Sequence, residues 1–277
     1  MHWKDHKYDP LFTFLTHSNY MIYDKHVDSV SGVEYKSYSF SHKGNRIQNE
    51  DFYITDDRDG IYIITDGMGG YKGGEVASRI AAHSCYQYLK NSRDRPINAD
   101  DLIDFIRLKL KDLVKTQSAY RFMGTTLCCL YIQDSHVHLI HVGDSKIIIV
   151  GDQTYQSSDH TYAQQLVDHQ LLHADEYRQH PMRHILTRCI SANTREPYQA
   201  DHQIIPLKNG RNTLFLCSDG VMENFSESRI IQMIREEPDL SKIILTLEQN
   251  TKKYSKDNST AIIVGFDFNE TTPSVNT

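Results

Sequence analysis

Residues 61–75 constrain the fold and the chemistry of this chain more than any other stretch. They read Ile-Tyr-Ile-Ile-Thr-Asp-Gly-Met-Gly-Gly-Tyr-Lys-Gly-Gly-Glu, an apolar run of strand type that ends on Asp66 and continues into a glycine-rich loop and a helical pattern. Glycine lets the backbone turn sharply and approach a bound group closely. This order places a carboxylate at a strand end with backbone carbonyls free to turn towards the same point, which is how a site for a hard cation begins.

Composition narrows the classes of protein to consider. With 277 residues and 24% charged residues, the chain is typical of a globular protein, and we expect one large domain. A net charge of −6 gives no basic surface for nucleic acid, so a nucleic-acid partner is disfavoured. The five cysteines show no CxxC spacing, which indicates reduced core residues. Because no apolar stretch suits a signal peptide or a bilayer crossing, we expect no membrane span and a cytoplasmic location.

Apolar periodicity predicts alternating groups of strands and helices. We expect strands at 33–40, 52–55, 61–66, 125–132, 136–142, 146–150, 203–206, 212–217 and 260–266, and helices at 75–89, 101–114, 227–235 and 240–253. Two joints, 133–135 and 143–145, are too short for a parallel crossover, so we expect them to connect antiparallel neighbours. The pattern predicts an α+β fold, a β-sandwich of two mainly antiparallel sheets flanked by α-helices. Residues 157–196 are polar and rich in histidine, with helical patches around 162–169 and 175–180 and no strand of any length, which indicates a mobile surface region.

Acids at strand ends are the candidate functional residues. Five pairs combine an acid with a turn residue or a second acid: Glu50-Asp51, Asp66-Gly67, Asp144-Ser145, Asp219-Gly220 and Asp257-Asn258. Each pair taken alone is explained by the turn preference of Asp, Gly and Asn. Buried strands that end together would, however, gather like charges, which raise one another's pKa unless cations compensate. Carboxylate and carbonyl oxygens suit Mg²⁺ or Mn²⁺, and no Cys/His spacing indicates structural zinc, so the residues indicate a two-metal hydrolase.

Eight short segments also match one known pattern, in order along nearly the whole chain. They are GNRIQNED at 44–51, DGMGG at 66–70 with GE at 74–75, MGTTL at 123–127, VGDS at 142–145, SDH at 158–160, HP at 180–181 with LTR at 186–188, CSDG at 217–220 and DNST at 257–260. On these segments, from about 33 to 266, the sequence resembles the metal-dependent protein serine/threonine phosphatases of the PPM family, also called PP2C-like, in their bacterial form. Each segment alone is weak evidence for the family, but eight segments in the same order are specific evidence.

The resemblance implies α/β/β/α layers with a binuclear Mn²⁺ or Mg²⁺ centre at one end of the two sheets. It implies that Asp66 bridges both ions, that Glu50 and the carbonyl of Gly67 hold one, and that Asp219 and Asp257 hold the other. It also implies a phosphatase domain at 31–268 with a flap-like region at about 157–200. Residues 1–30 would be an N-terminal extension of uncertain order, and residues 269–277 a C-terminal tail.

Further roles follow from the same resemblance. Asp144 would bind a weaker third ion with Asp219, Asp51 would support the ligands from behind, and Arg46 would grip the phosphate with its planar fork of donors. Met68 stands where some family members carry a histidine that has been proposed as a proton donor. A thioether cannot donate a proton, so that task would pass to water on the metal, and we expect Met68 to be a packing residue.

Other positions have a structural interpretation. Gln170 and Ser191 stand where the family often has glycine, so they concern the flap-like region rather than the metal site. His160, His180 and His184 lie in or near the matching segments, but a lone histidine is more often a structural hydrogen-bonding residue than a ligand. For His169 and His173, which could pair at helical spacing, we expect solvated surface because no acid joins them. Ser145 and Ser218 lack a Gly-x-Ser-x-Gly context and are expected to be hydrogen-bonding loop residues.

The function expected from the sequence is hydrolysis of phosphoserine and phosphothreonine in proteins by a metal-activated water, on substrates supplied by an opposing Ser/Thr kinase. The alternative is a weakly active or inactive PP2C-like module that binds a phosphoprotein partner. The intact set of Arg46, Glu50, Asp66, Asp219 and Asp257 favours the enzyme, because a binding module would be free to lose some of them. A two-metal nuclease is disfavoured by the missing basic groove.

Overall fold

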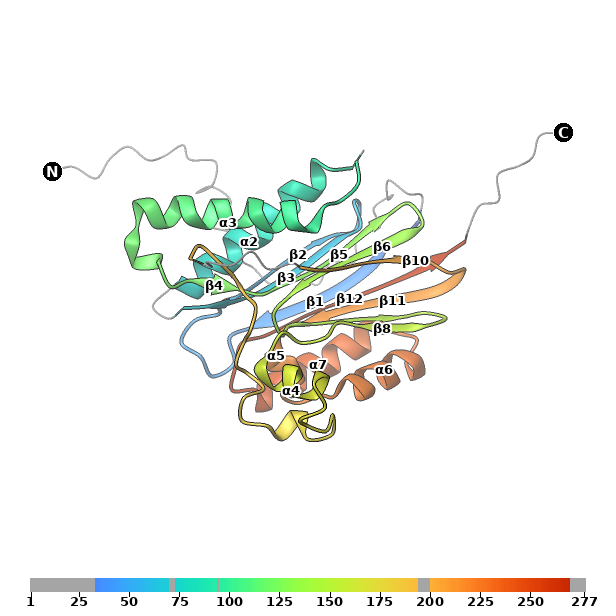
Figure 1. Cartoon of the computed structure of the whole chain (residues 1–277). Coiled ribbons are helices and arrows are strands. Elements are labelled where there is room, and N and C mark those ends of the chain that lie inside the picture. Colours follow the sequence, from blue (N-terminus) through green and yellow to red (C-terminus); the bar gives the residue numbers. More distant parts are fainter. Residues whose placement is uncertain (1–32, 70–72, 94, 194–199, 270–277) are drawn as a thin grey trace.

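Two β-sheets face each other and carry helices on both outer faces, so the chain forms a four-layer sandwich (Figure 1). This computed structural model describes residues 33–69, 73–93, 95–193 and 200–269. The strands are β1 (Lys36–His42), β2 (Asp51–Asp56), β3 (Ile61–Met68), β4 (Gly124–Thr125), β5 (Leu127–Gln133), β6 (His136–Val142), β7 (Lys146–Val150), β8 (Thr154–Gln156), β9 (Ile190–Ser191), β10 (Asp201–Pro206), β11 (Gly210–Cys217) and β12 (Ser259–Phe268). The helices are α2 (Gly73–Lys90), α3 (Ala99–Thr116), α4 (Tyr162–Asp168), α5 (Asp219–Met222), α6 (Glu227–Glu236) and α7 (Leu240–Tyr254).

The sheets are antiparallel, as expected. One has five strands in the order β1-β12-β11-β7-β8, and the other runs β10-β6-β5-β3-β4-β9 with β2 also paired to β3. Every one of these strand pairings is antiparallel. The predicted α+β sandwich is therefore confirmed.

Three apolar layers hold the sandwich together. One lies between α2, α3 and the larger sheet, one between the two sheets, and one between the smaller sheet and α5 to α7. β3 contributes to two of them, because Ile61 and Ile63 pack under the helices while Tyr62 and Ile64 face the other sheet. A strand that is buried on both faces has a continuous apolar sequence instead of an alternating one, which explains the run before Asp66.

The expectation for the joint at 143–145 is wrong. β6 pairs with β5 and β10 in the larger sheet, whereas β7 pairs with β8 and β11 in the smaller one, so this joint connects the two sheets. Facing sheets pack about 10 Å apart, a distance that three residues can span. Gly143 makes the turn with φ +111, and a Cβ on it would lie 2.5 Å from Cγ2 of Thr126. Asp144 therefore lies where the chain crosses from one sheet to the other.

Smaller differences concern short elements. The predicted strand at 125–132 is two strands, β4 and β5, and β8, β9 and α5 were not predicted because two to four residues give no period. The flap-like region contains α4 and a 3₁₀ turn at Tyr177–Gln179, close to the two helical patches in its sequence. Its first part is anchored in the fold, since Thr161 and Ala163 are fully buried.

Two further expectations can be compared with the structure, and others concern residues outside the described part of the chain. Four cysteines are buried and unbridged, and Cys189 is half-buried and also unbridged. Among the helices of the described residues, none has the length and apolar character needed to cross a bilayer. The expected N-terminal extension at 1–30 and the expected tail, apart from residue 269, lie outside the described residues, as do Gly70 and residues 194–199 of the flap-like region.

Gln170 gives a stability prediction. It follows α4 with φ +59, in the left-handed region that L residues other than glycine adopt at a cost. Replacing Gln170 with glycine should raise the free energy of unfolding by about 0.5–1 kcal/mol, measured by urea denaturation. The matched control is Gln165→Gly, at an exposed position inside α4, which should lower it by about 1 kcal/mol. An unchanged or lower stability for Gln170→Gly would show that the positive φ of Gln170 does not destabilise the fold.

Candidate metal centre

The acids expected at strand ends come from both sheets and act on one another. Asp66 near the end of β3 lies opposite Asp51 of β2, while Asp219 follows β11 and Asp257 precedes β12. Burial raises the pKa of Asp66 well above its usual value, and the negative charges that add to this effect are those of Asp51, Asp219, Asp144 and Asp257. The sandwich thus concentrates negative charge at one end of its two sheets.

Glu50 and Gly67 lie against each other through a close backbone approach. The amide N–H of Gly67 donates to the carbonyl of Glu50 at 3.1 Å. A Cβ on Gly67 would lie 2.1 Å from the carbonyl oxygen of Gly74, and one on Gly74 would lie 2.7 Å from the carboxyl carbon of Glu50. Only glycine fits at either position, so the glycines after Asp66 bring two backbones and the Glu50 carboxylate together.

Asn258 fixes the loop that carries Glu50, a role that sequence reasoning missed. Its side-chain NH₂ donates to the carbonyls of Lys43 and Gln48, each at 2.9 Å. Its side-chain oxygen accepts from the amide N–H of Glu50 at 2.8 Å. The only signal in the sequence is its place directly after Asp257, in a segment that matched the family pattern.

Two threonines fix Asp66, and their role was also missed. Thr126 accepts the amide N–H of Asp66 on Oγ1 and donates its own N–H to the Asp66 carbonyl, both at 2.9 Å. Thr125 Oγ1 donates to the same carbonyl at 2.9 Å. Thr126 Oγ1 also hydrogen-bonds Ser145 Oγ at 2.8 Å, so one buried hydroxyl joins the Asp66 loop to the Asp144 loop.

Asp51 lies behind the cluster, as expected. Its Oδ2 accepts from Ser218 Oγ and Thr260 Oγ1, both at 2.7 Å, while its buried Oδ1 has no hydrogen-bond partner among the described residues. Burial raises the pKa of Asp51 to about 7 despite these two hydrogen bonds, and the charges of Asp219 and Asp257 raise it further. The expectation that Ser218 and Ser145 are hydrogen-bonding loop residues is confirmed.

Arg46 lies at the centre but is engaged with a predicted ligand. Its Nε and Nη2 donate to the two carboxylate oxygens of Asp257 at 2.9 and 2.6 Å. This is the bidentate geometry in which a guanidinium also binds phosphate. The hydrogen bond to Asp257 raises the pKa of Arg46, and the charges of Asp219 and Glu50 add to it. Arg46 therefore faces the same acids that were expected to hold cations.

His184 joins the site, contrary to its structural interpretation. Asp144, His184 and Asp219 each offer one ligand atom, and these three atoms lie within 4.8 Å of one another. His184 Nδ1 is 3.8 Å from Asp219 Oδ2. The three residues line a hollow of about 360 Å³ whose other walls include Arg178 and Arg183. The acidic end of the sandwich is therefore open to a ligand on this side.

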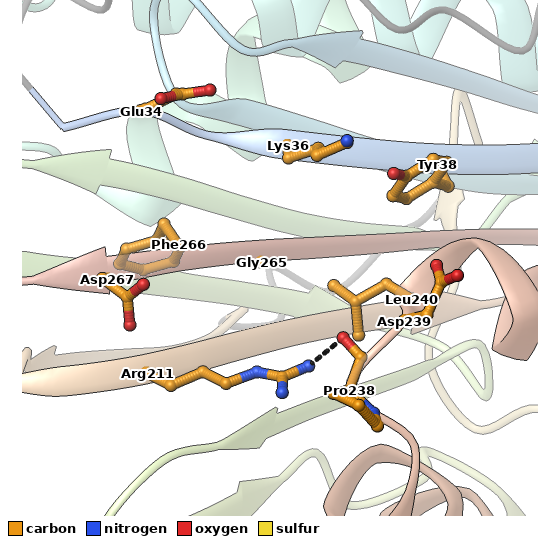
Figure 2. A pocket seen from close by; sticks show the side chains of 10 residues that line it. All are labelled: Glu34, Lys36, Tyr38, Arg211, Pro238, Asp239, Leu240, Gly265, Phe266 and Asp267. Carbon is orange, nitrogen blue, oxygen red and sulfur yellow. Dashed lines mark hydrogen bonds between the residues drawn. The ribbon is translucent and has the colours of Figure 1, made fainter.

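A larger hollow of about 530 Å³ lies elsewhere, on the helix-covered face of the smaller sheet (Figure 2). Lys36, Arg211 and Asp267 line it beside the link between α6 and α7, where Arg211 donates to the carbonyl of Pro238 at 2.8 Å. None of the acids of the candidate centre borders this hollow. The size of this hollow is therefore no evidence that it takes part in the chemistry.

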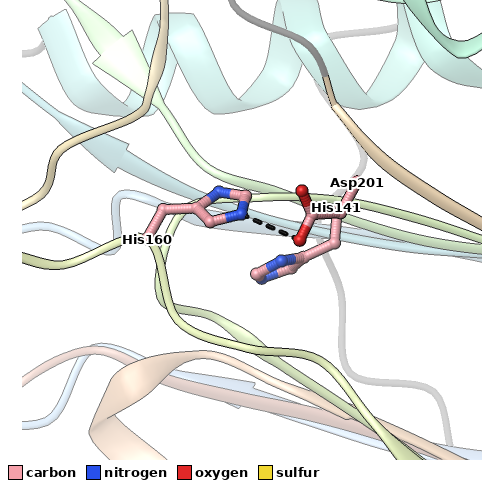
Figure 3. Close-up of side chains that lie close together, drawn as sticks. All are labelled: His141, His160 and Asp201. Atoms are coloured by element: carbon pink, nitrogen blue, oxygen red, sulfur yellow. Dashed lines mark ion pairs between the residues drawn. The ribbon is translucent and has the colours of Figure 1, made fainter. Parts of the chain in front are cut away.

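His141, His160 and Asp201 form a second group whose ligand atoms lie within 4.8 Å of one another (Figure 3). His160 Nδ1 accepts the amide N–H of Gly143 at 3.1 Å, so its proton is on Nε2, which lies 3.1 Å from Asp201. Arg188 donates to the other oxygen of Asp201 at 3.0 Å. A metal would need the lone pair where this proton lies. The group is therefore a hydrogen-bond network that fixes Gly143 beside Asp144.

The residues present fit hard divalent cations. All predicted ligands of the binuclear centre offer oxygen, the buried Asp51 has an unpartnered oxygen, and the two glycines leave room that a Cβ would fill. Glu50, Asp66 and Asp257 are absent from the two compact groups found among the described residues, and Asp257 is engaged by Arg46. Met68 lies opposite Gly124 on β4 and contacts it, consistent with packing.

Comparison with known proteins gives concordant matches. The family model described as "Protein phosphatase 2C" matches residues 40–257. The serine/threonine protein phosphatase PstP of Mycobacterium tuberculosis is 26% identical over 237 residues, which cover 82% of this chain and 45% of PstP. Protein phosphatase PhpP of Streptococcus pneumoniae is 30% identical over 199 residues, covering 68% of this chain and 79% of PhpP. The chain thus spans less than half the length of PstP.

Solved structures agree with these matches. A crystal structure of M. tuberculosis PstP/Ppp has a TM-score of 0.77 at 23% identity and covers 85% of this chain and 100% of that one. The catalytic domain of PstP in complex with two manganese ions has a TM-score of 0.71 at 22% identity, covering 85% of this chain and 99% of that one. At these identities the likeness establishes the fold, which is the sandwich that the sequence predicts.

Proposed function

Because the chain belongs to the protein phosphatase 2C family, we propose that it hydrolyses phosphoserine and phosphothreonine in proteins with two or three Mn²⁺ or Mg²⁺ ions. The observation that carries the proposal is that carboxylates from both sheets lie around Asp66. Burial raises the pKa of Asp66, and the charges of these carboxylates raise it further. Cations at this point offset the repulsion, and the manganese-bound relative supports their identity. A Ser/Thr kinase that supplies the substrate and a cytoplasmic location complete the proposal.

The proposed ligand roles follow the positions of the residues. Asp66 would be shared by two ions, Glu50 and the carbonyl of Gly67 would hold one, Asp219 and Asp257 would hold the other, and Asp144 with Asp219 would hold a third. Asp51 supports the set through the hydrogen bonds it accepts from Ser218 and Thr260. We propose the phosphatase domain at 31–268, with its flap-like region at about 157–200 beside the hollow that Asp144 and Asp219 line.

Two such ions lower the pKa of a water molecule and stabilise the entering and leaving oxygens of an in-line displacement at phosphorus. The protein must orient the phosphate, exclude other nucleophiles and hold the acids in place. Ser218 Oγ donates to Asp51 and accepts from the Thr260 N–H, and Ser145 Oγ is bonded to Thr126. Because both hydroxyls are engaged and buried, the site supports direct attack by water without a phosphoserine enzyme intermediate.

The test of this function is phosphate release from a phosphoserine or phosphothreonine peptide. We expect release with Mn²⁺, loss of release with excess EDTA, and recovery when Mn²⁺ is added back, because no described side chain replaces the charge of the ions. Full activity in EDTA would sink the metal-dependent proposal. No release from peptides or from p-nitrophenyl phosphate with Mn²⁺ would favour the binding module.

Arg46→Ala should raise KM for the phosphopeptide about tenfold with a smaller effect on kcat, because a bidentate phosphate contact is worth about 1–2 kcal/mol. Steady-state kinetics at saturating Mn²⁺ measures this effect. Arg46→Lys keeps the charge but loses the fork, and should recover only part of the affinity. If Arg46 serves only to hold Asp257, its bidentate partner here, the apparent Mn²⁺ affinity will change while KM for the phosphopeptide stays constant.

A further inference from the structure

His184 is the one nitrogen ligand candidate at an otherwise oxygen-lined centre within the described residues. Its Nδ1 lies 3.8 Å from Asp219 Oδ2, and the ligand atoms of Asp144, His184 and Asp219 lie within 4.8 Å of one another. In an octahedral shell at about 2.1 Å, cis ligands are about 3 Å apart and trans ligands about 4.2 Å, so a shift of less than about 2 Å brings these atoms into one coordination shell.

The position of His184 is fixed by the backbone that follows it. The carbonyl of Ile185 accepts from the N–H of Tyr162 at 2.8 Å, and the N–H of Thr187 donates to the carbonyl of His160 at 2.8 Å. Leu186 forms a β-bridge with the fully buried Thr161. His184 is thus carried by a segment anchored to the fold, although its own ring is half-exposed.

The same segment is fastened to the helix that carries Asp219. Arg178 donates through Nη2 to the carbonyl of Met222 at 2.8 Å and through Nη1 to the carbonyl of Phe225 at 3.0 Å. Met222 is the last residue of α5, which begins at Asp219. These bonds couple the place of His184 to that of Asp219, so their proximity is a feature of the fold.

The charges around His184 favour a cation at this point. Asp144 and Asp219 face it, and burial together with the charge of Asp219 raises the pKa of Asp144 well above its usual value. Lys146, the nearby cation most deeply buried, is engaged by Asp159 and lies 3.6 Å from Glu227. Arg178 is engaged with the α5 carbonyls, and the charge of Lys146 only partly offsets the effect of burial and of Asp219 on the pKa of Asp144.

We propose that His184 Nδ1 is the third protein ligand of an ion held by Asp144 and Asp219, and that this nitrogen makes the site prefer Mn²⁺ to Mg²⁺. Mn²⁺ also prefers oxygen ligands, but as a transition metal it accepts an imidazole nitrogen more readily than Mg²⁺, which takes oxygen ligands almost alone. The inference rests on the proposed third-ion role of the two carboxylates. It adds a residue and a metal selectivity to that role.

Pulsed EPR of bound Mn²⁺ tests the inference without catalysis. Because every other proposed ligand is oxygen, coupling of Mn²⁺ to ¹⁴N should appear in the native protein only as the third equivalent of Mn²⁺ binds. His184→Asn should abolish this coupling, leave two Mn²⁺ bound by equilibrium dialysis, and weaken the third about tenfold. Its Mg²⁺ affinity should change less than twofold.

His180→Asn is the matched control. His180 lies in the same segment, but its Nδ1 accepts from the N–H of Met182 at 3.2 Å, so the variant should keep the ¹⁴N coupling. Absence of ¹⁴N coupling in the native protein, its persistence in His184→Asn, or binding of only two Mn²⁺ would each overturn the inference. A protein that shows the coupling but releases no phosphate would contradict the proposed function and leave the ligand assignment standing.

Discussion

Replacing Asp66 with asparagine is expected to lower kcat/KM for p-nitrophenyl phosphate in Mn²⁺ by about 10³-fold or more. The substitution keeps the shape of the side chain and removes the charge on which Asp51, Asp219, Asp144 and Asp257 converge. A neutral amide cannot bridge two cations through two anionic oxygens. Steady-state kinetics over a range of Mn²⁺ concentrations should show that added metal does not restore the loss.

Asp152→Asn is the control, at an exposed turn between β7 and β8, and it should leave activity unchanged. The stability of Asp66→Asn in EDTA separates a chemical loss from misfolding. Because burial and like charges raise the pKa of Asp66, its removal should stabilise the metal-free protein at pH 8 and raise Tm by about 2 °C or more. Activity within tenfold of the native protein, or a variant that is less stable in EDTA, would contradict the assigned role.

The fold was largely predictable because the strand signals are local. β3 is a continuous apolar run bounded by turn residues, and it begins where the sequence predicts. The connection between β6 and β7 was not predictable from its length. Three residues can close a hairpin or span two facing sheets, and the choice depends on how Gly143 packs against Thr126, far away in the chain.

In the candidate metal centre, too, local features were predictable and long-range contacts were not. The acids were found because each follows or precedes a strand, and the topology brings their charges together. The contacts that orient them were not found, since Asn258 accepts from the N–H of Glu50 across 208 positions and Arg46, expected to bind phosphate, pairs with Asp257 across 211. A single sequence gives no sign of such hydrogen bonds, because Asn and Thr occur in every loop. His184 was set aside for a related reason, since Asp144 and Asp219 approach it only in the folded chain.

The fall of stability with rising pH is expected to disappear when saturating metal is added. In EDTA the free energy of unfolding should fall as pH rises from about 6.5 to 8.5, because burial raises the pKa of Asp51 to about 7 and those of Asp66 and Asp144 well above their usual value. A carboxyl whose pKa is raised by folding stabilises the protein while protonated, and this contribution is lost as pH rises through the folded pKa. Asp51 alone should account for about 1 kcal/mol of the fall.

Histidines whose pKa is lowered by folding change the stability in the opposite direction below about pH 6.5. Burial lowers the pKa of His138 to about 4 and that of His141 to about 3, so both destabilise the protein as pH falls below about 6.5. Between about pH 4 and 6.5 these histidines therefore oppose the raised carboxyls, whose effect on stability begins near their unfolded pKa. Above that range both imidazoles are neutral in the folded and unfolded states, and the carboxyls alone set the slope.

Saturating Mn²⁺ should flatten the slope, because cations replace the protons that the raised carboxyls hold, and these carboxyls then carry no protons in either the folded or the unfolded state above about pH 6.5. At 100 times the dissociation constant, one ion adds about 2.7 kcal/mol. Urea denaturation at pH 6.5, 7.5 and 8.5, with EDTA and with Mn²⁺, measures both slopes. Asp51→Asn should flatten the EDTA slope, since an amide does not titrate, and Asp152→Asn should not. A stability that rises with pH in EDTA would show that these carboxyls are ionised without metal, against the charge concentration on which the proposed centre depends.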